Sequence, residues 1–308
     1  MKIAVVGAGS MGCIYATFMA EAGHEVWTVD TWQDHIDAVR ANGLRLEGAS
    51  GDRTVAVQAT TDATEVGTCD LVIIATKAMH VEQAAKSALA LAGDDTDIVT
   101  IQNGLGSADK VAALIDRGRL AIGVAEGFGA SMKGPGHAHH NGMKLIRLGN
   151  RNAKVSAELE KVAMVWADAG FNVKTFDDID QLIWEKLICN VCYSGTSTIT
   201  EWTIAEILGD EDAWRVASGC AAEAYAVAKA RGIHLDYDDP VAHVHEFGSK
   251  LGAAQTSMLL DVLNGRRCEI DAINGAIPPA GAEVGVPTPY NEVVTSIIRA
   301  KEVRLGLR

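Results

Sequence analysis

Three polar side chains recur at four-residue intervals in an otherwise apolar stretch of the chain. Lys186, Asn190 and Ser194 are separated by leucine, isoleucine, cysteine, valine and tyrosine residues, and this spacing places all three on one face of a helix. Reduction of a ketone requires a proton donor for the oxygen while hydride reaches the carbon, and a partly desolvated lysine can donate that proton. The pattern therefore favours Lys186 as a general acid. The alternative is a lysine whose aliphatic stem covers the core while its ammonium group reaches water.

The first dozen residues contain a second set of candidates. An apolar run over residues 3–6 predicts a strand buried on both faces, and a glycine-rich turn follows it directly. In a dinucleotide-binding turn, the first glycine allows the tight turn, the second lets a pyrophosphate approach the backbone, and the third lets the next helix pack closely. The predicted cofactor-binding turn consists of Gly7, Ala8, Gly9, Ser10, Met11 and Gly12.

An acidic residue ends the next predicted strand, Glu25–Val29. Asp30 lies about 20 residues after the glycines, where a carboxylate accepts hydrogen bonds from the adenosine ribose hydroxyls. The same charge repels a 2′-phosphate, and Thr31 and Trp32 supply no arginine to hold one, so the sequence favours NAD over NADP. The alternative for this region is an ordinary strand–helix–strand turn with a surface aspartate.

Two further strand ends carry polar side chains. Lys77 follows the strand predicted at 70–75, where a cation suits phosphate or ribose oxygens. Asn103 follows the strand predicted at 98–102 and offers a donor and an acceptor to a nicotinamide or a substrate carbonyl. Ligands of open α/β sheets lie beyond the carboxyl ends of the strands, so both residues are candidates for the cofactor site. The alternative for each is a solvated loop residue.

A last polar cluster lies near residue 265. Glu269 is predicted to begin a helix over 270–284, and the preference of helix N-termini for acidic side chains is one explanation for it. Asp261 with Arg266 or Arg267 has the composition of a structural ion pair.

The elements that position these residues change character along the chain. Up to residue 176, strands at 3–6, 25–29, 70–75, 98–102, 120–124, 145–148 and 172–176 alternate with helices at 14–22, 33–42, 81–92 and 155–169. A hairpin or edge strands are predicted at 44–47 and 54–59, and the polar, glycine-rich stretch 125–142 receives no regular element. This alternation predicts a doubly wound parallel sheet of Rossmann type, a dinucleotide-binding domain over 1–176.

From residue 177 onward only helical periodicity remains. Helices are predicted at 179–194, 213–231, 241–251, 258–263, 270–284 and 290–307, which defines an all-α substrate and catalytic domain over 177–308. The apolar helices at 216–230 and 290–307 have two explanations, a homodimer interface or the core of this domain, and the core is the simpler one.

The composition limits the classes of partner. With 48% hydrophobic and 22% charged residues over 308 positions, the chain is predicted to be a soluble globular protein, and a net charge of −13 without a basic run disfavours nucleic acid and anionic membranes. Met1 and Lys2 lead directly into a strand, so a cytoplasmic location without a signal peptide is expected. Cys189 and Cys192 lie within a helical run and lack further zinc ligands at suitable spacing, so they are predicted to be core residues, and no metal site is expected.

Taken together in this order and spacing, the motifs resemble those of the ketopantoate reductase (2-dehydropantoate 2-reductase) family over essentially the whole chain. The matching segments are GAGSMG at 7–12, TKA at 76–78, QNGLG at 102–106, WEKLICN at 184–190, SMLLD at 257–261 and CEIDAING at 268–275. The resemblance implies a Rossmann domain, a helical domain and an active site between them.

The resemblance also implies a role for individual residues. Lys186 becomes the general acid, and Glu269 helps to arrange substrate and cofactor. Asn103 is placed at the nicotinamide end and Lys77 near the adenosine ribose. The substrate's hydroxyl and carboxylate groups are assigned to Asn190 and Ser257, and Ser194 continues this substrate-binding face. Family members typically reduce a branched 2-oxo acid to the (R)-2-hydroxy acid, most often with NADPH, in the pathway to pantothenate and coenzyme A.

Four positions differ from the family's pattern. Ser194 and Ala254 stand where substrate-side asparagines are usual, and residues 125–127 replace a threonine-rich strand end. Asp30 and Thr31 replace the basic residue that holds a 2′-phosphate. The first three differences bear on the substrate and the fourth on the cofactor.

Three functions follow from these observations. The main hypothesis is an NAD(P)H-dependent reductase of a branched 2-oxo acid, of 2-dehydropantoate 2-reductase type. The alternative is an NAD-dependent D-2-hydroxyacid dehydrogenase that acts on another branched or aromatic 2-oxo acid. A non-catalytic dinucleotide sensor is the third, and a lysine retained on an apolar helix disfavours it.

Overall fold

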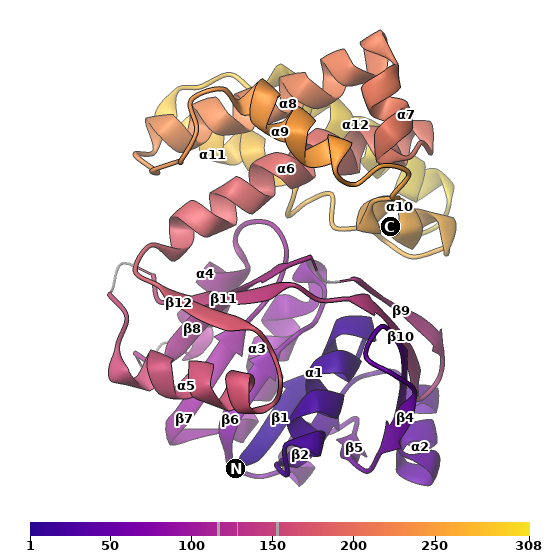
Figure 1. Cartoon of the computed structure of the whole chain (residues 1–308), viewed down its shortest axis with the longest axis vertical. Coiled ribbons are helices and arrows are strands. Elements are labelled where there is room, and N and C mark those ends of the chain that lie inside the picture. Colours follow the sequence, from indigo (N-terminus) through magenta and orange to yellow (C-terminus); the bar gives the residue numbers. More distant parts are fainter. Residues whose placement is uncertain (116–117, 128, 152–153) are drawn as a thin grey trace. The chain divides into compact units, whose positions relative to one another are not determined.

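The computed structural model describes residues 1–115, 118–127, 129–151 and 154–308. Packing divides the chain into two compact units, one formed by Met1–Gln102 with Ser107–Ile179 and the other by Asn103–Gly106 with Asp180–Arg308. The first unit contains the strands of the chain, and the second is helical (Figure 1).

The first unit is built on an eight-stranded sheet of order β12-β11-β8-β7-β6-β1-β2-β5. Its strands are β1 (Lys2–Val6), β2 (Glu25–Val29), β5 (Gln58–Thr60), β6 (Cys69–Ile74), β7 (Ala92–Thr100), β8 (Leu120–Glu126), β11 (Leu145–Gly149) and β12 (Val173–Phe176). Neighbouring strands pair in parallel except β11, which runs antiparallel to β8. The predicted Rossmann-type fold is confirmed, and the correction is that the sheet is mixed, because β11 and β12 both run opposite to the other strands.

Helices cover both faces of this sheet. Alternate residues of β1 face opposite ways: Ile3 and Val5 pack in one apolar cluster with α1 (Ser10–Glu21) and α5 (Ala157–Asp168), whereas Ala4 and Val6 pack in another with α3 (Val81–Leu91) and α4 (Ser107–Ile115). β1 is therefore buried on both sides, as its apolar run predicts. The helix α2 (Gln33–Asn42) packs against β5, and the 3₁₀ turns η1 (Ala63–Glu65) and η2 (Ala78–His80) complete the unit. The sequence analysis did not identify α4.

A second sheet of four strands lies in the same unit, in the order β4-β3-β10-β9. The antiparallel pair β3 (Leu44–Gly48) and β4 (Arg53–Val55) confirms a hairpin here, but the predicted strand at 54–59 is divided, because its end belongs to β5 of the larger sheet. The other two strands, β9 (Gly129–Gly134) and β10 (His137–Gly142), occupy the stretch 125–142 that was left without an element, of which residue 128 lies outside the described residues. Their polar sequences lack apolar alternation, so pairing of β10 with β3 defines these strands rather than local pattern.

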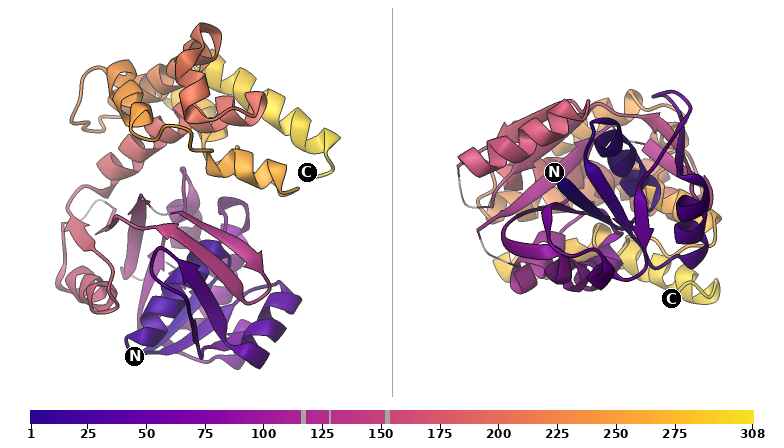
Figure 2. Two further views of the ribbon diagram at one scale, coloured as in Figure 1. Left: turned by 45° about the vertical axis from the view of Figure 1, so that its right-hand side comes forward. Right: turned by 90° about the horizontal axis from the view of Figure 1, so that it is seen from below.

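The second unit is a set of helices around the long α6 (Ile179–Thr200), whose first residue belongs to the first unit by its packing. The others are α7 (Ile204–Gly209), α8 (Glu211–Ala230), α9 (Pro240–Ser249), α10 (Ser257–Leu263), α11 (Ile277–Val284) and α12 (Pro289–Arg304), with the 3₁₀ turn η3 (Asn274–Ala276) before α11. In Figure 2 the yellow α12 runs to the end marked C. α6 extends beyond its predicted end, and α7 was not predicted.

The prediction of a helix over 270–284, with Glu269 at its start, is wrong for its first half. The amides of Ala272 and Ile273 both donate to the Glu269 carbonyl oxygen, at 3.0 and 3.1 Å, and close a series of turns instead. The regular helix α11 begins only at Ile277, with prolines in its first turn, where a missing N–H leaves no bond unsatisfied. The helix-dipole explanation for Glu269 therefore does not apply.

The four residues Asn103–Gly106 lie within the range predicted for the Rossmann domain but pack with the helical unit. The Leu105 amide donates to the Ala272 carbonyl oxygen at 2.9 Å. Gly104 has a φ of +84°, and a Cβ atom there would lie 2.1 Å from that same oxygen. This close approach requires a glycine and fixes the turn that carries Asn103.

Cys189 and Cys192 are both buried, which confirms that they are core residues. Burial raises the pKa of the Cys189 thiol to about 12.

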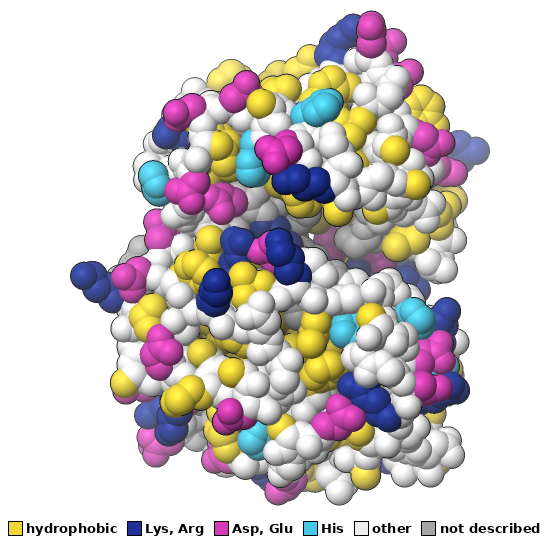
Figure 3. Space-filling view, viewed as in Figure 1, with side chains coloured by type: hydrophobic (Ala, Val, Ile, Leu, Met, Phe, Trp, Pro, Cys, Tyr) yellow, Lys and Arg dark blue, Asp and Glu magenta, His cyan; other side chains and the backbone are white. Residues whose placement is uncertain are grey.

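On the face shown in Figure 3, acidic and basic side chains lie interspersed over the surface. Within the described ranges, no helix combines the length and the apolar character needed to cross a membrane.

Candidate active site

The turn after β1 has the geometry that its glycines predict. Gly7 has a φ of +96°, and a Cβ atom there would lie 2.6 Å from the backbone nitrogen of Thr76. A Cβ at Gly12 would lie 2.0 Å from the Gly7 carbonyl oxygen, so α1 and the turn approach too closely for any side chain. At Gly9, by contrast, no described atom lies within 4 Å of the Cβ position. The second glycine therefore borders open space, as a backbone that receives a pyrophosphate requires.

The start of α1 fits an anionic ligand as well. Gly9 is the N-cap, and among the described residues no side chain bonds the first amides of the helix, which begins with Ser10 and Met11. Uncapped amides at a helix N-terminus carry the positive end of the helix dipole. Together with the open side of Gly9, they fit the pyrophosphate of a nicotinamide dinucleotide.

Asp30, at the carboxyl end of β2, holds this turn in place. One carboxylate oxygen accepts the Ala8 amide at 2.7 Å, and the other accepts the Trp32 amide at 3.0 Å. The side chain is half-buried. Since a carboxylate has about four acceptor sites, Asp30 retains capacity for ribose hydroxyls while it holds Ala8.

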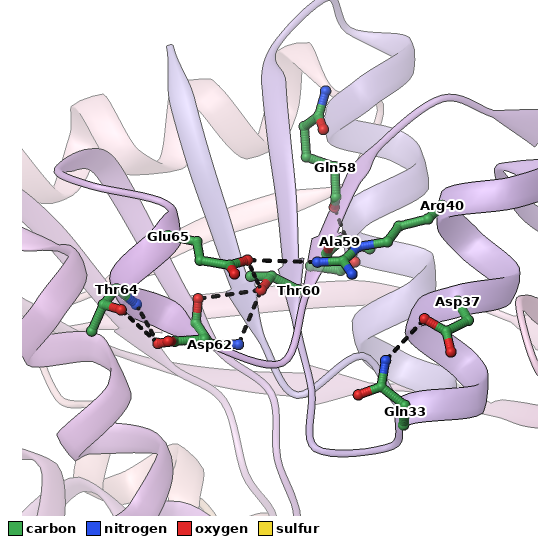
Figure 4. A network of polar contacts seen from close by, with 10 residues as sticks. Gln33, Asp37, Arg40, Gln58, Ala59, Thr60, Asp62, Thr64 and Glu65 are labelled. Carbon is green, nitrogen blue, oxygen red and sulfur yellow. Dashed lines mark hydrogen bonds and ion pairs between the residues drawn. The ribbon is translucent and has the colours of Figure 1, made fainter.

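The arginine that follows Asp30 most closely in the chain is engaged elsewhere. Figure 4 shows the Arg40 guanidinium directed to β5 and η1, where Nε donates to the Ala59 carbonyl oxygen at 2.7 Å and Nη2 lies 3.5 Å from Glu65. Glu65 also accepts the Thr60 hydroxyl at 2.6 Å, and the Thr60 carbonyl accepts the Asp30 amide at 3.2 Å. This network supports the end of β2.

Lys77 lies one residue beyond the contact between Thr76 and the glycine turn. It is half-buried and precedes η2, where its carbonyl accepts the His80 amide at 2.9 Å. The first unit thus brings the glycine turn, Asp30 and Lys77 to the same edge of its sheet.

In the second unit, α6 carries the polar stripe that the sequence predicts. Lys186 and Asn190 are half-buried, whereas Ser194 is only 4% exposed. The neighbouring Leu187 and Val191 are fully packed in the core of this unit. The stripe therefore runs from a partly accessible end at Lys186 into the interior at Ser194.

The turn that carries Glu269 is joined to α6. Glu269 is 5% exposed, and Asn274, later in the same series of turns, is completely buried. The Asn274 amide group donates to the Val191 carbonyl oxygen at 2.9 Å and to the Asn291 side chain at 3.0 Å. Asn274 was not among the predicted site residues, although it lies in the segment 268–275 singled out by its motif.

The turns that carry two of the candidates, Asn103 and Glu269, are linked by backbone hydrogen bonds. Asn103 precedes Leu105, whose amide bonds Ala272, and Ala272 bonds back to Glu269. The structure thus brings the Asn103 and Glu269 turns side by side. Ser257 is separate from them: it is exposed and begins α10 after the N-cap Thr256.

The ion pair predicted for the last polar cluster is present. Arg266 Nε lies 3.3 Å from Asp261, and Arg267 bonds Asp271 instead, at 2.9 Å. Asp261 therefore has the structural role that its composition suggests.

Comparison with known proteins assigns the chain to a family. A family model described as ketopantoate reductase PanE/ApbA matches residues 3–153, and one described as its C-terminal part matches 178–302. A 2-dehydropantoate 2-reductase of Streptococcus pyogenes serotype M3 is 29% identical over 310 residues, which span 100% of both chains.

Solved structures agree over nearly the whole chain. A PanE/ApbA family ketopantoate reductase from Ralstonia eutropha JMP134 is 32% identical with a TM-score of 0.91, covering 99% of this chain and 100% of its own. D-mandelate dehydrogenase, in a ternary structure with NADH and anilino(oxo)acetate, is 29% identical with a TM-score of 0.93 and covers 100% of each chain. The chain belongs to the ketopantoate reductase family of NAD(P)-dependent oxidoreductases that act on 2-oxo and 2-hydroxy acids.

Proposed function

We propose that this protein reduces a branched 2-oxo acid of the 2-dehydropantoate type to the (R)-2-hydroxy acid, with NADH as the reductant and Lys186 as the proton donor. The observation that carries the proposal is the stripe of Lys186, Asn190 and Ser194 on α6, in a unit that also holds the turn of Glu269. A polar face this close to a packed apolar core suits a small polar substrate.

In the proposed reaction the two units supply different groups. The bound nicotinamide supplies the hydride for the carbonyl carbon. Lys186 donates its proton to the carbonyl oxygen as the new hydroxyl forms, and is then reprotonated from water. Asn190 and Ser257 hold the substrate's hydroxyl and carboxylate groups, and Asn103 holds the nicotinamide end. Glu269 helps to arrange the substrate and the cofactor relative to each other.

NADH is favoured over NADPH by charge at the end of β2. A 2′-phosphate bound there would meet the carboxylate of Asp30 and that of Asp34 in the first turn of α2. Arg40 is engaged with Ala59 and Glu65 and so does not offset this repulsion. Repulsion between like charges disfavours the phosphate, whereas ribose hydroxyls can donate to Asp30.

A second candidate is an NAD-dependent D-2-hydroxyacid dehydrogenase with a different substrate. Ser194 is small and buried, and Ala254 is exposed and has no polar side chain, so neither position matches a pantoate-forming site. The similarity to D-mandelate dehydrogenase, solved with NADH and anilino(oxo)acetate, adds support for this alternative.

A paired assay tests both candidates. Purified protein is given ketopantoate with NADH or NADPH, and then phenylglyoxylate and branched 2-oxo acids, while loss of the reduced nicotinamide absorbance is followed. Turnover of ketopantoate with NADH is expected. Turnover of another 2-oxo acid alone would favour the second candidate, and a preference for NADPH would contradict the role of Asp30.

A further inference from the structure

The turn that carries Glu269 lacks regular secondary structure, so other groups must hold it. Cys268, Glu269 and Ile270 are each at most 5% exposed, yet they lie between the end of α10 and the start of η3. Backbone bonds close the turn internally, from Ala272 and Ile273 to the Glu269 carbonyl oxygen. They fix its curvature, but its place in the unit depends on contacts with distant residues.

The first such contact comes from a buried carboxylate on α12. Glu302 is completely buried, and its Oε1 accepts the Cys268 amide at 2.9 Å. Its Oε2 accepts Nε of Arg308 at 2.9 Å, and its carbonyl oxygen accepts the Leu307 amide at 2.9 Å. The charge of Glu302 is thus balanced by Arg308 while it holds the residue directly before Glu269.

The second contact lies on the other side of Glu269. Asp271 gathers three arginines: Arg299 Nε donates to Oδ1 at 2.7 Å, Arg267 donates to Oδ2 at 2.9 Å, and Arg308 also bonds Oδ2. Burial alone would raise the pKa of the Asp271 carboxyl, but hydrogen bonds from Arg308, Arg299 and Arg267 outweigh it and lower that pKa. Arg308 bonds both carboxylates, that of Glu302 and that of Asp271.

We infer that Asp271, Glu302 and Arg308 form a clamp that positions Glu269 for the reaction. The clamp grips the turn one residue before Glu269 and two residues after it, so Glu269 has little freedom to move. These are positioning residues that act through Glu269. The inference rests on the proposed function, because it assigns them a task in that reaction.

The clamp reaches a second candidate residue through the backbone. Ala272 follows Asp271 directly, and its carbonyl oxygen accepts the Leu105 amide at 2.9 Å. The close approach at Gly104 leaves no room for a shift of Ala272 without a shift of the Asn103 turn. A displaced Asp271 therefore disturbs Asn103 as well as Glu269.

The test compares Arg308→Ala with Arg308→Lys and with Arg304→Ala, a matched arginine on the exposed surface at the end of α12. In Arg308→Ala we expect kcat for the 2-oxo acid to fall by about 10-fold, because small misplacement of a reacting group has effects of this order or larger. The dissociation constant of NADH should change less than about 2-fold, the scatter of uncoupled sites. Arg308→Lys should recover part of kcat, and Arg304→Ala should resemble the wild type.

A double-mutant cycle with Glu269→Gln separates positioning from a general loss of stability. If Arg308 acts through Glu269, Arg308→Ala lowers kcat less than about 2-fold in the Glu269→Gln background. Multiplication of the two single effects would overturn the inference, since Arg308 would then act by another route. Equal kcat in Arg308→Ala and wild type would overturn it too.

Amide hydrogen exchange gives a readout that needs no turnover. Exchange over 268–273 should accelerate in Arg308→Ala while α6 and α8 stay protected. Unchanged exchange would reject the clamp. If wild-type protein reduces no 2-oxo acid, the proposed function fails, and faster exchange would still support the clamp, so the two failures are distinguishable.

Discussion

The turn after β1 and the turn around Glu269 are both held in place by side chains from elsewhere in the chain, but in different ways. In each, a carboxylate from a distant part of the chain accepts a backbone amide: Asp30 accepts that of Ala8 at 2.7 Å, and Glu302 accepts that of Cys268 at 2.9 Å. Asp30 is half-buried and keeps acceptor sites for a ligand, whereas Glu302 is completely buried and paired with Arg308. In the proposed function Asp30 both holds its turn and contacts the cofactor, whereas Glu302 only holds its turn.

This difference follows from what each turn must do. A pyrophosphate is bound by backbone amides, so the first turn needs glycines and an open approach. In the proposed reaction Glu269 acts through its side chain, so its turn needs a fixed direction, and a network of ion pairs supplies that. We therefore expect substitutions in the first unit to alter cofactor binding and those in the second to alter turnover.

The largest expected effect is at Lys186. Lys186→Ala should lower kcat by about 100-fold or more, the usual contribution of a general acid, because water must then protonate the carbonyl oxygen. The dissociation constant of NADH, measured by fluorescence titration, should be retained. Lys229→Ala, which removes an exposed lysine at the end of α8, is the matched control. Unchanged turnover in Lys186→Ala would remove the proposed acid.

Gly12 and Gly9 offer a matched pair within the first turn. Gly12→Ala forces a Cβ to within 2.0 Å of the Gly7 carbonyl oxygen and should lower the free energy of unfolding by about 1–3 kcal/mol or more. Gly9→Ala meets no described atom within 4 Å, so stability should change by less than about 0.5 kcal/mol. Its NADH affinity should nevertheless fall, because the methyl group occupies the approach of the pyrophosphate. Urea unfolding and NADH titration of both variants measure the contrast; equal affinity in Gly9→Ala and wild type would contradict it.

The difference between the two turns also explains which features of the site could be predicted from the sequence. The glycine turn, Asp30 and the polar stripe of α6 rest on short-range spacing, which the chain displays directly. The clamp unites residues far apart in the chain, such as Cys268 and Glu302, which are 34 positions apart, and no local pattern marks that pairing. β10 was missed for the same reason, because its polar sequence becomes a strand only through pairing with β3.

The false helix at Glu269 has a different cause. The apolar spacing of Ile270 and Ile273 is helical, and both residues are indeed buried in the core of the second unit. The periodicity of apolar residues alone does not distinguish a helix from a series of turns that buries the same side chains. Pro278 and Pro279, which suit only the first turn of a helix, were the available signal that α11 begins at Ile277.

Cofactor choice sharpens the assignment of Asp30. In Asp30→Asn the amide retains an acceptor for Ala8 but carries no charge, so the kcat/KM with NADPH should rise relative to NADH by about 10-fold. Asp37→Asn, which removes a carboxylate of α2 that bonds Gln33, is the control and should change this ratio less. An unchanged ratio in Asp30→Asn would mean that charge at the end of β2 does not select the cofactor.

The smallest expected effect is a difference between the two turns in their response to mild acid. His35 is completely buried beside the first turn, and its Nδ1 accepts the Gly136 amide at 2.9 Å, which requires an unprotonated nitrogen. Burial lowers the pKa of His35, and the charge of Asp30 opposes this only in part. Below about pH 6.5 the unfolded chain takes up a proton that the folded chain refuses, so this contribution to stability is complete above that pH and is lost as the pH falls.

The pH dependence from Asp271 has the same sign as that from His35, because both pKa values are lowered, but it lies at lower pH. The pKa of Asp271 is lowered, so its contribution is present above the ordinary carboxyl range of about pH 4 and is lost only as the pH falls through the lowered value. Between pH 7 and 5, amide exchange corrected for its intrinsic rate should therefore accelerate around β10 and α2 but not at 268–273. His35→Gln should abolish this pH dependence at α2 and only reduce it at β10, because burial also lowers the pKa of His140 on that strand. His234→Gln, at an exposed histidine, should change neither. Equal acceleration at both places would mean that His35 does not set the response and that the two turns are not held independently.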